Sequence, residues 1–150
     1  PEKLHGLFVT NLLEGKKVPI YGDGLQIRDW LFVEDHCEGI DAIIHKGKIG
    51  ESYCLGGDAE KTNLEITEII LKLLNLGEEM IEHVKDRPGH DRRYAMNFSK
   101  AKNELGWEPR TSFEDGMKKT VEWYKNNVEW WKKIKSGEYL DYFKKQYLDR

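Results

Sequence analysis

The sequence predicts an α/β fold that contains more helix than strand. Several stretches place apolar residues three or four positions apart, which is typical of amphipathic helices. Between them lie only four or five short β-rich runs. Strands so few and so scattered do not make a complete doubly wound sheet, so we expect a small or incomplete one.

The first part of the chain predicts one helix followed by two short strands. Apolar residues at helical spacing predict the helix over residues 2–14, and Gly15 ends it. The β-rich runs 18–21 and 27–33 follow, and the glycine-rich segment 22–24 between them predicts a turn.

The middle of the chain predicts two helices with a brief strand between them. Residues 34–46 have a helical pattern that a glycine closes, and residues 51–55 are β-rich. Thr62 and Glu65 have the spacing of a capping box, so we expect a helix to begin there and to end near Gly77. The first of these helices has an apolar face that carries Cys37, Ile40, Ile43 and Ile44.

The region after the second of these helices predicts a strand, a loop and a short helix. Residues 82–85 are β-rich, and the polar segment 86–93 cannot be helical through Pro88 and Gly89. The pattern of residues 99–105 predicts a short helix that the next glycine stops.

The last part of the chain predicts amphipathic helix. Thr111 and Glu114 have the spacing of a second capping box. The helix after it is expected to run past Val128, because apolar residues recur at helical spacing up to that position. The last 20 residues, rich in Lys, Tyr and Trp, also have a helical pattern.

The composition excludes several classes of protein. Lys and Arg total 24 and Asp and Glu total 27, and the resulting net charge of −3 does not favour a nucleic-acid partner. The mean hydropathy is −0.72, and no apolar run approaches the roughly 20 residues that a membrane-spanning helix needs. Cys37 and Cys54 are too few for a disulfide framework, so we expect both to be reduced in a cytoplasmic protein.

Common catalytic and metal-binding motifs are missing from the sequence. The five histidines show neither H-x-x-x-H nor H-E-x-x-H spacing, so no metal site is expected. There is no G-x-S-x-G motif, and the glycines at 22–24 lack the third glycine of a dinucleotide-binding fingerprint.

Two basic loops are the most informative segments for function. In the first, Arg28 lies beside Asp29 and two residues before Trp30, so its guanidinium could be held by that carboxylate and ring and offered to a phosphate. The alternative is a surface Arg–Asp pair on a β-hairpin. In the second, a Pro-Gly turn could present Arg87 and His90 to a diphosphate or to sugar hydroxyls, or the loop could simply be solvated.

Three strings of the sequence carry a resemblance to a known family. They are VPIYGDGLQIRDWLFVEDH, DRPGHDRRYAMNFSKAKNELGW and TVEWYKNNVEWW. Together they resemble the C-terminal half of the dTDP-glucose 4,6-dehydratases, which belong to the extended short-chain dehydrogenase/reductase superfamily. The resemblance covers essentially the whole chain. It implies that residues 1–150 are a nucleotide-sugar-binding C-terminal part that carries a piece of an incomplete Rossmann sheet.

The resemblance implies a lyase activity and a division of labour between two parts of the enzyme. In that family NAD is held by an N-terminal Rossmann domain, takes hydride from sugar C4 and returns it at C6 after water is lost across C5 and C6. The glycine-rich fingerprint, the Tyr-x-x-x-Lys pair and the acid/base residues all precede the segment that this chain matches. No catalytic or cofactor-binding residue is therefore carried over, and the chain alone is expected to be inactive.

The resemblance also implies substrate-binding residues for a dTDP-sugar. Arg28 matches a phosphate-binding arginine, and Asn63 matches a polar ligand of the nucleotide, although a role in helix capping competes for that position. The full set of matched positions is Lys3, Leu4, Pro19, Ile20, Tyr21, Arg28, Asn63, Asp86, Arg87, Pro88, Gly89 and His90.

Further expectations concern the assembly of the protein. Because the first residue is Pro1 rather than Met, we expect the chain to be part of a longer protein. The helix over 34–46 and the strand over 51–55 would then lack the sheet that they normally complete, which predicts an exposed apolar surface. The family resemblance implies a homodimer of the whole enzyme. Two alternatives stay open, namely a non-catalytic binding module and part of a nucleotide-sugar 4-epimerase.

Overall fold

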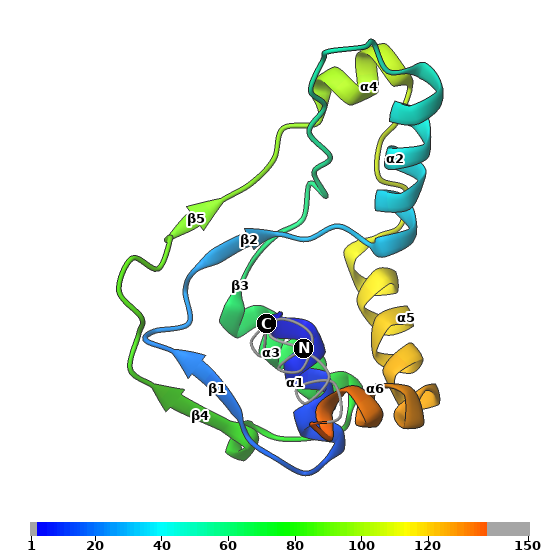
Figure 1. The fold of residues 1–150 in the computed structure, drawn as a ribbon. Helices are drawn as coiled ribbons and strands as arrows, with labels where there is room; N and C mark the ends of the chain where they lie inside the picture. The colour runs from blue at the N-terminus through cyan, green and yellow to red at the C-terminus, as the bar shows by residue number, and fades with distance from the viewer. Residues whose placement is uncertain (1–2, 138–150) are drawn as a thin grey trace, which may run out of the picture.

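The structure is a computed structural model that describes residues 3–137. Its helices and strands are interspersed along the chain, which confirms the predicted α/β class (Figure 1). In chain order the elements are α1 (Leu4–Leu13), β1 (Val18–Tyr21), β2 (Ile27–Asp29), α2 (Val33–Lys46), β3 (Glu60–Thr62), α3 (Asn63–Leu73), the 3-10 helix η1 (Glu78–Met80), β4 (Ile81–Val84), β5 (Arg93–Tyr94), α4 (Ser99–Leu105), α5 (Phe113–Asn126) and α6 (Val128–Lys135).

The strands form two small sheets rather than one large one. β1 pairs with β4 in parallel, with Tyr21 opposite Val84. β2 is the central strand of the other sheet, where it pairs antiparallel with β3 and parallel with β5. The small, incomplete sheet that the sequence predicts is thus confirmed.

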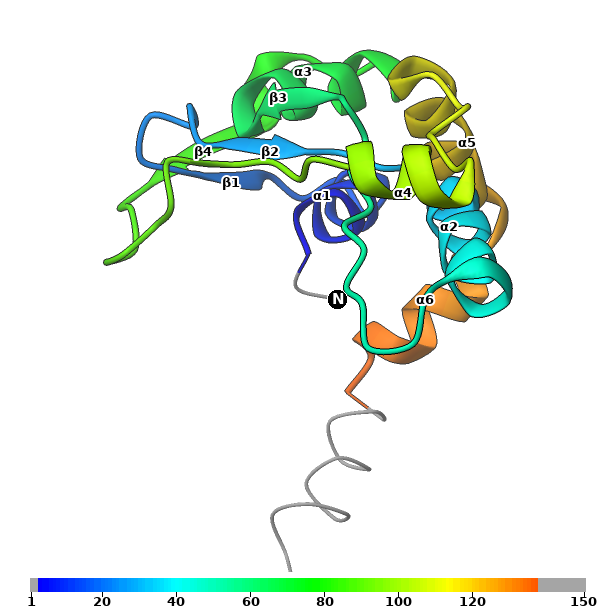
Figure 2. The ribbon, with the colours of Figure 1, turned by 90° about the horizontal axis from the view of Figure 1, so that it is seen from above.

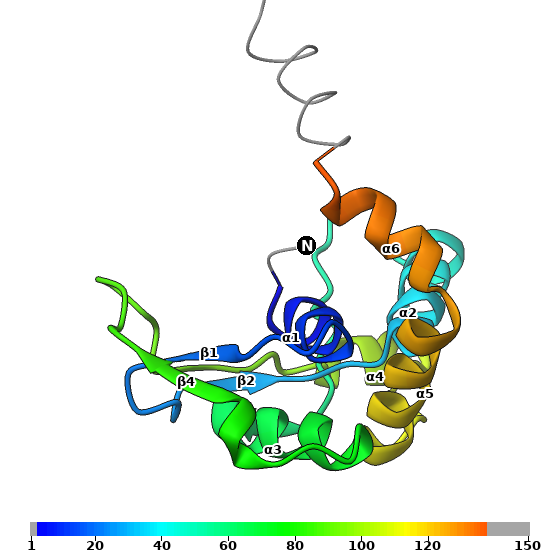
Figure 3. The same cartoon turned by 90° about the horizontal axis from the view of Figure 1, so that it is seen from below.

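The strands lie between two helices that supply most of the main core. Seen from above and from below, α3 covers one face of the strands and α1 lies on the other (Figures 2 and 3). Completely buried side chains from three elements meet there, because β-branched residues pack well against a pleated surface. Among the most buried are Val9 of α1, Val18 and Ile20 of β1, and Ile66 and Ile70 of α3.

A second, smaller core joins α2 to α4 at the other end of the molecule. Trp107 is buried between the two helices and its indole N–H donates a 3.0 Å hydrogen bond to the Asp35 carbonyl oxygen. The Asp35 carboxylate, only 4% exposed, accepts hydrogen bonds from the Thr111 backbone N–H at 2.9 Å and the Thr111 hydroxyl at 3.2 Å. Asp35 therefore ties α2 to the segment that leads into α5.

Most of the local sequence signals are confirmed. Thr62 and Glu65 form the predicted capping box, with the Glu65 N–H 3.1 Å from the Thr62 hydroxyl and the Thr62 N–H 2.7 Å from the Glu65 carboxylate. Gly106 ends α4 with a φ of +71°, a left-handed conformation that favours glycine. The first helix, the 22–24 turn, β4 and the non-helical loop after it also lie where they were predicted.

The strand predictions are wrong in four places. Residues 51–55 form no strand, whereas β3 and β5 arise at 60–62 and 93–94, in segments that were predicted to be loops. The strand predicted over 27–33 stops at Asp29. The physical reason is that a strand exists only where another strand pairs with it, and its own residues do not specify that partner.

The prediction that Thr111 and Glu114 form a second capping box is also wrong. Ser112, not Thr111, caps α5, because its hydroxyl accepts a 3.1 Å hydrogen bond from the Asp115 N–H while Thr111 is bound to Asp35. The long helix is interrupted at Asn127, which separates α5 from α6. Of the helix predicted over the last 20 residues, the part after position 137 lies outside the described residues.

One face of α2 is apolar and exposed, as predicted. Val33, Cys37, Ile40 and Ile44 recur at helical spacing, and Ile44 is 73% exposed. Ile43, which was assigned to the same face, instead packs into the second core. We call the first four residues the α2 apolar face. Within residues 3–137, no helix combines the length and the apolar character needed to cross a membrane.

We predict that Asp35→Ala destabilises the protein by about 1–3 kcal/mol, since it leaves the half-buried N–H and hydroxyl of Thr111 without their acceptor. The measurement is the free energy of unfolding in urea. Asp41→Ala removes an exposed carboxylate from the same helix and should change stability by less than about 0.5 kcal/mol. Equal losses in the two variants would show that the hydrogen bonds to Thr111 contribute nothing.

Candidate functional site

The candidate site lies at the carboxyl ends of the parallel strands β1 and β4, a common position for ligands in α/β proteins. The turn after β1 packs against the loop after β4, because the Gly22 N–H donates a 2.9 Å hydrogen bond to the Val84 carbonyl oxygen. Gly22 has a φ of +58°, and a Cβ there would lie 3.1 Å from the Asp86 carboxylate. The glycine therefore allows the turn and the loop to approach closely.

Asp86 organises the loop that follows β4. One carboxylate oxygen accepts a 2.7 Å hydrogen bond from His90 Nδ1 and a 2.9 Å bond from the Arg87 backbone N–H. The other oxygen accepts a 2.9 Å bond from Gln26 Nε2. The hydrogen bond from His90 is the main cause that lowers the pKa of Asp86 below its ordinary value. The structure thus brings Asp86 and His90 together, as the resemblance implies.

The His90 ring links this loop to β1. Its side chain is only 8% exposed, and it meets the exposed ring of Tyr21 edge to face, with the ring centroids 6.4 Å apart. The tautomer follows from the Asp86 contact, because a carboxylate can only accept and Nδ1 must then carry the proton. Tyr21, Asp86 and His90 therefore form one connected cluster, with Arg87 and Gly89 exposed on the loop.

Arg28 is held differently from either sequence-based interpretation. Its guanidinium lies over the ring of Tyr94, 4.2 Å from the centroid, and one N–H donates to the Ile27 carbonyl oxygen at 2.6 Å. Asp29 does not pair with it but accepts hydrogen bonds from backbone amides across the sheet. Trp30 packs against the main core. The Arg–Asp pair on a hairpin is also wrong, since β2 lies between β3 and β5.

Two of the four arginines around the site are already neutralised. Arg92 binds Asp23 through two contacts of 2.9 Å, and Arg93 binds Glu60 through two contacts of 2.6 and 2.7 Å. Within the described part of the chain, no carboxylate lies within 4.0 Å of the Arg28 or Arg87 guanidinium. These two arginines therefore supply the uncompensated positive charge of the site.

The remaining predicted residues are less closely joined to this cluster. Ile20 is buried in the main core, and its strand neighbour Pro19 is half-buried. Lys3 and Leu4 lie at the start of α1, where Leu4 packs against the same core. Asn63 is the first residue of α3, and its backbone N–H binds the Gln26 carbonyl oxygen at 3.0 Å. Capping is done by Thr62, which leaves the Asn63 side chain available.

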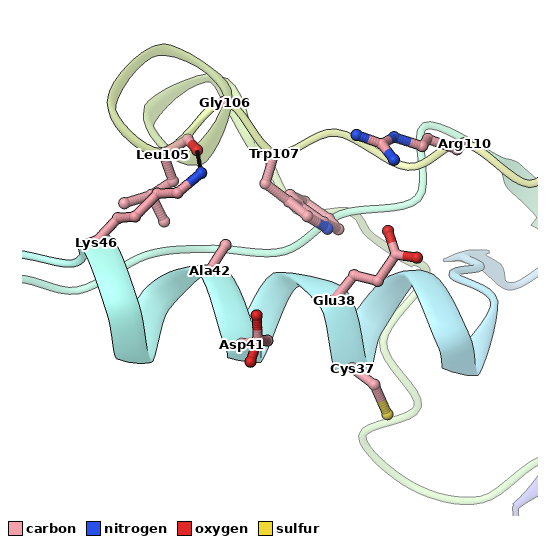
Figure 4. A pocket seen from close by; sticks show the side chains of 9 residues that line it. All are labelled: Cys37, Glu38, Asp41, Ala42, Lys46, Leu105, Gly106, Trp107 and Arg110. Carbon is pink, nitrogen blue, oxygen red and sulfur yellow. Dashed lines mark hydrogen bonds between the residues drawn. The ribbon is translucent and has the colours of Figure 1, made fainter.

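Two cavities of about 440 Å³ lie outside the Tyr21–Asp86–His90 cluster. The first separates α2 from the segment after α4, where Glu38, Lys46 and Arg110 line it beside the buried Trp107 (Figure 4). The second lies beside Asp29, Asp58 and Arg93. No three His, Cys, Asp or Glu side chains gather to hold a metal ion in residues 3–137.

A comparison with known families identifies the family of the chain. A sequence model described as GDP-mannose 4,6 dehydratase matches residues 1–120. The chain belongs to this family. The matched residues include every residue of the candidate site. The similarity to solved structures of the extended short-chain dehydrogenase/reductase superfamily confirms the fold expected from the sequence.

Similar proteins include dehydratases and, at a lower level, an epimerase. The dTDP-glucose 4,6-dehydratase of Streptomyces antibioticus is 48% identical over 135 residues, which cover 90% of this chain and 40% of that protein. The structure of the dTDP-glucose 4,6-dehydratase of Bacillus anthracis in complex with NAD is 57% identical, with a TM-score of 0.84, over 89% of this chain and 42% of that one. A UDP-glucose 4-epimerase of Thermotoga maritima with UDP-glucose is 28% identical, with a TM-score of 0.79, over 84% of this chain and 40% of that one.

These comparisons confirm the resemblance to the dTDP-glucose 4,6-dehydratases. They also show that the chain spans about two fifths of the length of the curated relatives it matches.

Sequence reasoning missed two residues of the site. Tyr94 supplies the ring under Arg28, but no spacing rule joins positions 66 residues apart in the chain. Gln26 lies two positions before Arg28 and reaches Asp86 across the site. A single polar residue among the apolar neighbours Leu25 and Ile27 was the one signal that could have pointed to it.

Proposed function

We propose that the chain is the nucleotide-sugar-binding part of an NAD-dependent dTDP-glucose 4,6-dehydratase, a lyase that converts dTDP-glucose to dTDP-4-keto-6-deoxyglucose and water. The observation that carries the proposal is the uncompensated Arg28 guanidinium, stacked on Tyr94. Arg28 follows two residues after Gln26, whose side chain donates to Asp86 of the Tyr21–Asp86–His90 cluster. The identity of 57% to a dehydratase, against 28% to a 4-epimerase, supports this reaction class over the sibling one.

The site suits the diphosphate of such a nucleotide. Stacking engages the face of the Arg28 guanidinium and leaves N–H groups on its edge for phosphate oxygens. Arg87 and His90 lie on the loop after β4 and close the same site from the other side. The exposed Tyr21 ring and the half-buried Pro19 offer an apolar surface to the nucleoside, with Asn63 as a polar neighbour.

NAD is assigned to another part of the enzyme. Among the described residues, the glycine-rich turn at 22–24 joins strand β1 to strand β2. A dinucleotide site instead needs a glycine-rich turn that leads from a strand into a helix. The residues present therefore do not fit the cofactor, and no catalytic step is assigned to them. A homodimer of the whole enzyme and a cytoplasmic location belong to the same proposal.

The α2 apolar face is assigned to packing against that NAD-binding part. Relatives are more than twice as long as this chain, and the face is an exposed apolar row that lies outside the second core, into which Ile43 of the same helix packs. Burying it would remove apolar surface from water, which is the main driving force for such association.

We predict that Arg28→Ala weakens the binding of dTDP to the chain by about 10- to 100-fold. A hydrogen bond to a charged group contributes about 1.5–3 kcal/mol, and 1.4 kcal/mol corresponds to tenfold in affinity. Arg28→Lys should recover only part of the loss, because an ammonium cannot bind two oxygens in a fork. Isothermal titration with dTDP measures all three constants.

The matched control for this titration is Arg110→Ala. It removes the same charge from the cavity beside Trp107, away from the candidate site, and should leave the affinity within about twofold, as screening of a distant charge implies. An Arg28→Ala variant that binds dTDP as tightly as the wild type would assign Arg28 to a structural role alone.

We predict that the chain alone does not turn over dTDP-glucose. Hydride and proton transfer each need their own positioned groups, which binding energy by itself does not replace. The measurement is formation of the 4-keto product after incubation with NAD and dTDP-glucose. Product above the no-protein background would contradict the proposed division of labour.

We predict that the chain binds a hydrophobic fluorescent dye through the α2 apolar face. Ile40→Lys combined with Ile44→Lys should remove most of the signal. Leu25→Lys is the control, since Leu25 and Ile40 are 42% and 43% exposed but Leu25 lies outside this face. Addition of the NAD-binding part of a dTDP-glucose 4,6-dehydratase should displace the dye. A signal that persists in the double variant would locate the apolar surface elsewhere.

A further inference from the structure

Gln26 connects three segments of the candidate site. It lies between the 22–24 turn and β2, and only 2% of it is exposed. Its backbone carbonyl oxygen accepts the Asn63 N–H at 3.0 Å, which joins it to the start of α3. Its side-chain Nε2 donates to the Asp86 carboxylate at 2.9 Å, which joins it to the loop after β4. The backbone then continues directly to Arg28.

The side-chain amide of Gln26 is buried and makes a single hydrogen bond, from Nε2, among the described residues. Oε1 has no hydrogen-bond partner among the described residues. Burial of an unpaired amide oxygen is unfavourable, so an apolar residue would suit the core better at this position. The hydrogen bond that the amide donates to Asp86 offsets this unfavourable burial, and an apolar side chain could not form it.

The hydrogen bond from Gln26 fixes the direction of the Asp86 carboxylate. With one oxygen bound to Nε2, the other faces the Arg87 N–H and His90 Nδ1. A neutral donor suits this task, because it leaves the negative charge of Asp86 for the hydrogen bond from His90. That bond in turn holds the His90 ring against Tyr21.

We propose that Gln26 is a positioning residue of the nucleotide site, which acts through Asp86 to hold the 86–90 loop in its binding conformation. The inference rests on the proposed function for its ligand, but the linkage from Gln26 to Asp86, His90 and Tyr21 is independent of the ligand. Gln26 itself need not touch the nucleotide.

Two single variants test the donor. Gln26→Leu keeps the approximate size of the side chain but removes Nε2, and Gln26→Glu replaces the donor by a carboxylate that faces Asp86. Each should weaken dTDP binding about tenfold, the factor that corresponds to about 1.4 kcal/mol. Each should also speed hydrogen–deuterium exchange in a peptide covering residues 85–92, since the Arg87 amide loses its ordered acceptor.

A double variant distinguishes positioning from a general loss of structure. In Gln26→Glu with Asp86→Asn, the amide nitrogen of residue 86 can donate to residue 26, while its oxygen still accepts from Arg87 and His90. The hydrogen bond is rebuilt with its direction reversed. We expect exchange in the 85–92 peptide to be slower than in Gln26→Glu alone, a coupling that a double-mutant cycle isolates.

Asn103→Asp is the matched charge control, because it adds the same single negative charge on the exposed surface of α4. It should change neither exchange in the 85–92 peptide nor dTDP binding. Wild-type exchange in Gln26→Leu, or a double variant no better than Gln26→Glu, would overturn the inference. Absence of dTDP binding to the wild type would instead overturn the proposed function, and the exchange measurements would still decide the role of Gln26.

Discussion

The carboxylate of Asp29 is the constraint on which the arrangement of the site depends. One oxygen accepts the Ala59 N–H at 3.0 Å and the other accepts the Gly57 N–H at 2.9 Å and the Met96 N–H at 3.5 Å. The end of β2 is thereby tied to the segment before β3 and to the segment after β5. Gly56 is needed for this approach, because a Cβ there would lie 2.1 Å from the Met96 carbonyl oxygen. Hydrogen bonds to an ionised acceptor are stronger than neutral ones, so a single side chain can hold three backbone segments in register.

This constraint determines what Arg28 can do. Because Asp29 is occupied by backbone amides, it cannot neutralise its neighbour, and β5 is held where Tyr94 lies opposite Arg28. Stacking on the ring orients the guanidinium and leaves its positive charge unpaired. An ion pair would orient the guanidinium but also neutralise it. Arg92 and Arg93 show the contrast, since Asp23 and Glu60 neutralise them. The neighbouring strands β2 and β5 therefore carry arginines of two kinds, since Arg93 is neutralised by an ion pair whereas Arg28 stacks on Tyr94.

Sequence reasoning succeeded where the signal was local and failed where it was not. The Thr62–Glu65 capping box and the glycine after α4 were predictable because each acts within a few residues. β3 and β5 were missed because their pairing with β2 arises from contacts such as those of Asp29, which join distant positions. Thr111 shows the conflict directly, since a residue with the right spacing for a cap is instead bound to Asp35, 76 positions earlier. Within the site, motif resemblance pointed to Arg28, Asp86 and His90 but not to Tyr94, which lies under Arg28, or to Gln26, which donates to Asp86.

The proposed binding of a diphosphate by a chain with a net charge of −3 requires positive charge that is concentrated locally rather than overall. Asp23 and Glu60 form ion pairs with Arg92 and Arg93. Arg28 and Arg87 have no carboxylate partner in the part of the chain that the structure describes, so the positive charge is concentrated on them. Asp86 does not cancel this effect, because its charge is directed to His90, the Arg87 backbone N–H and the Gln26 amide rather than to a guanidinium. Asp86, the first residue of the 86–90 loop, thus shapes the site without neutralising a guanidinium. The positive charge of the site is consequently determined by which groups the carboxylates bind, and not by the number of basic residues.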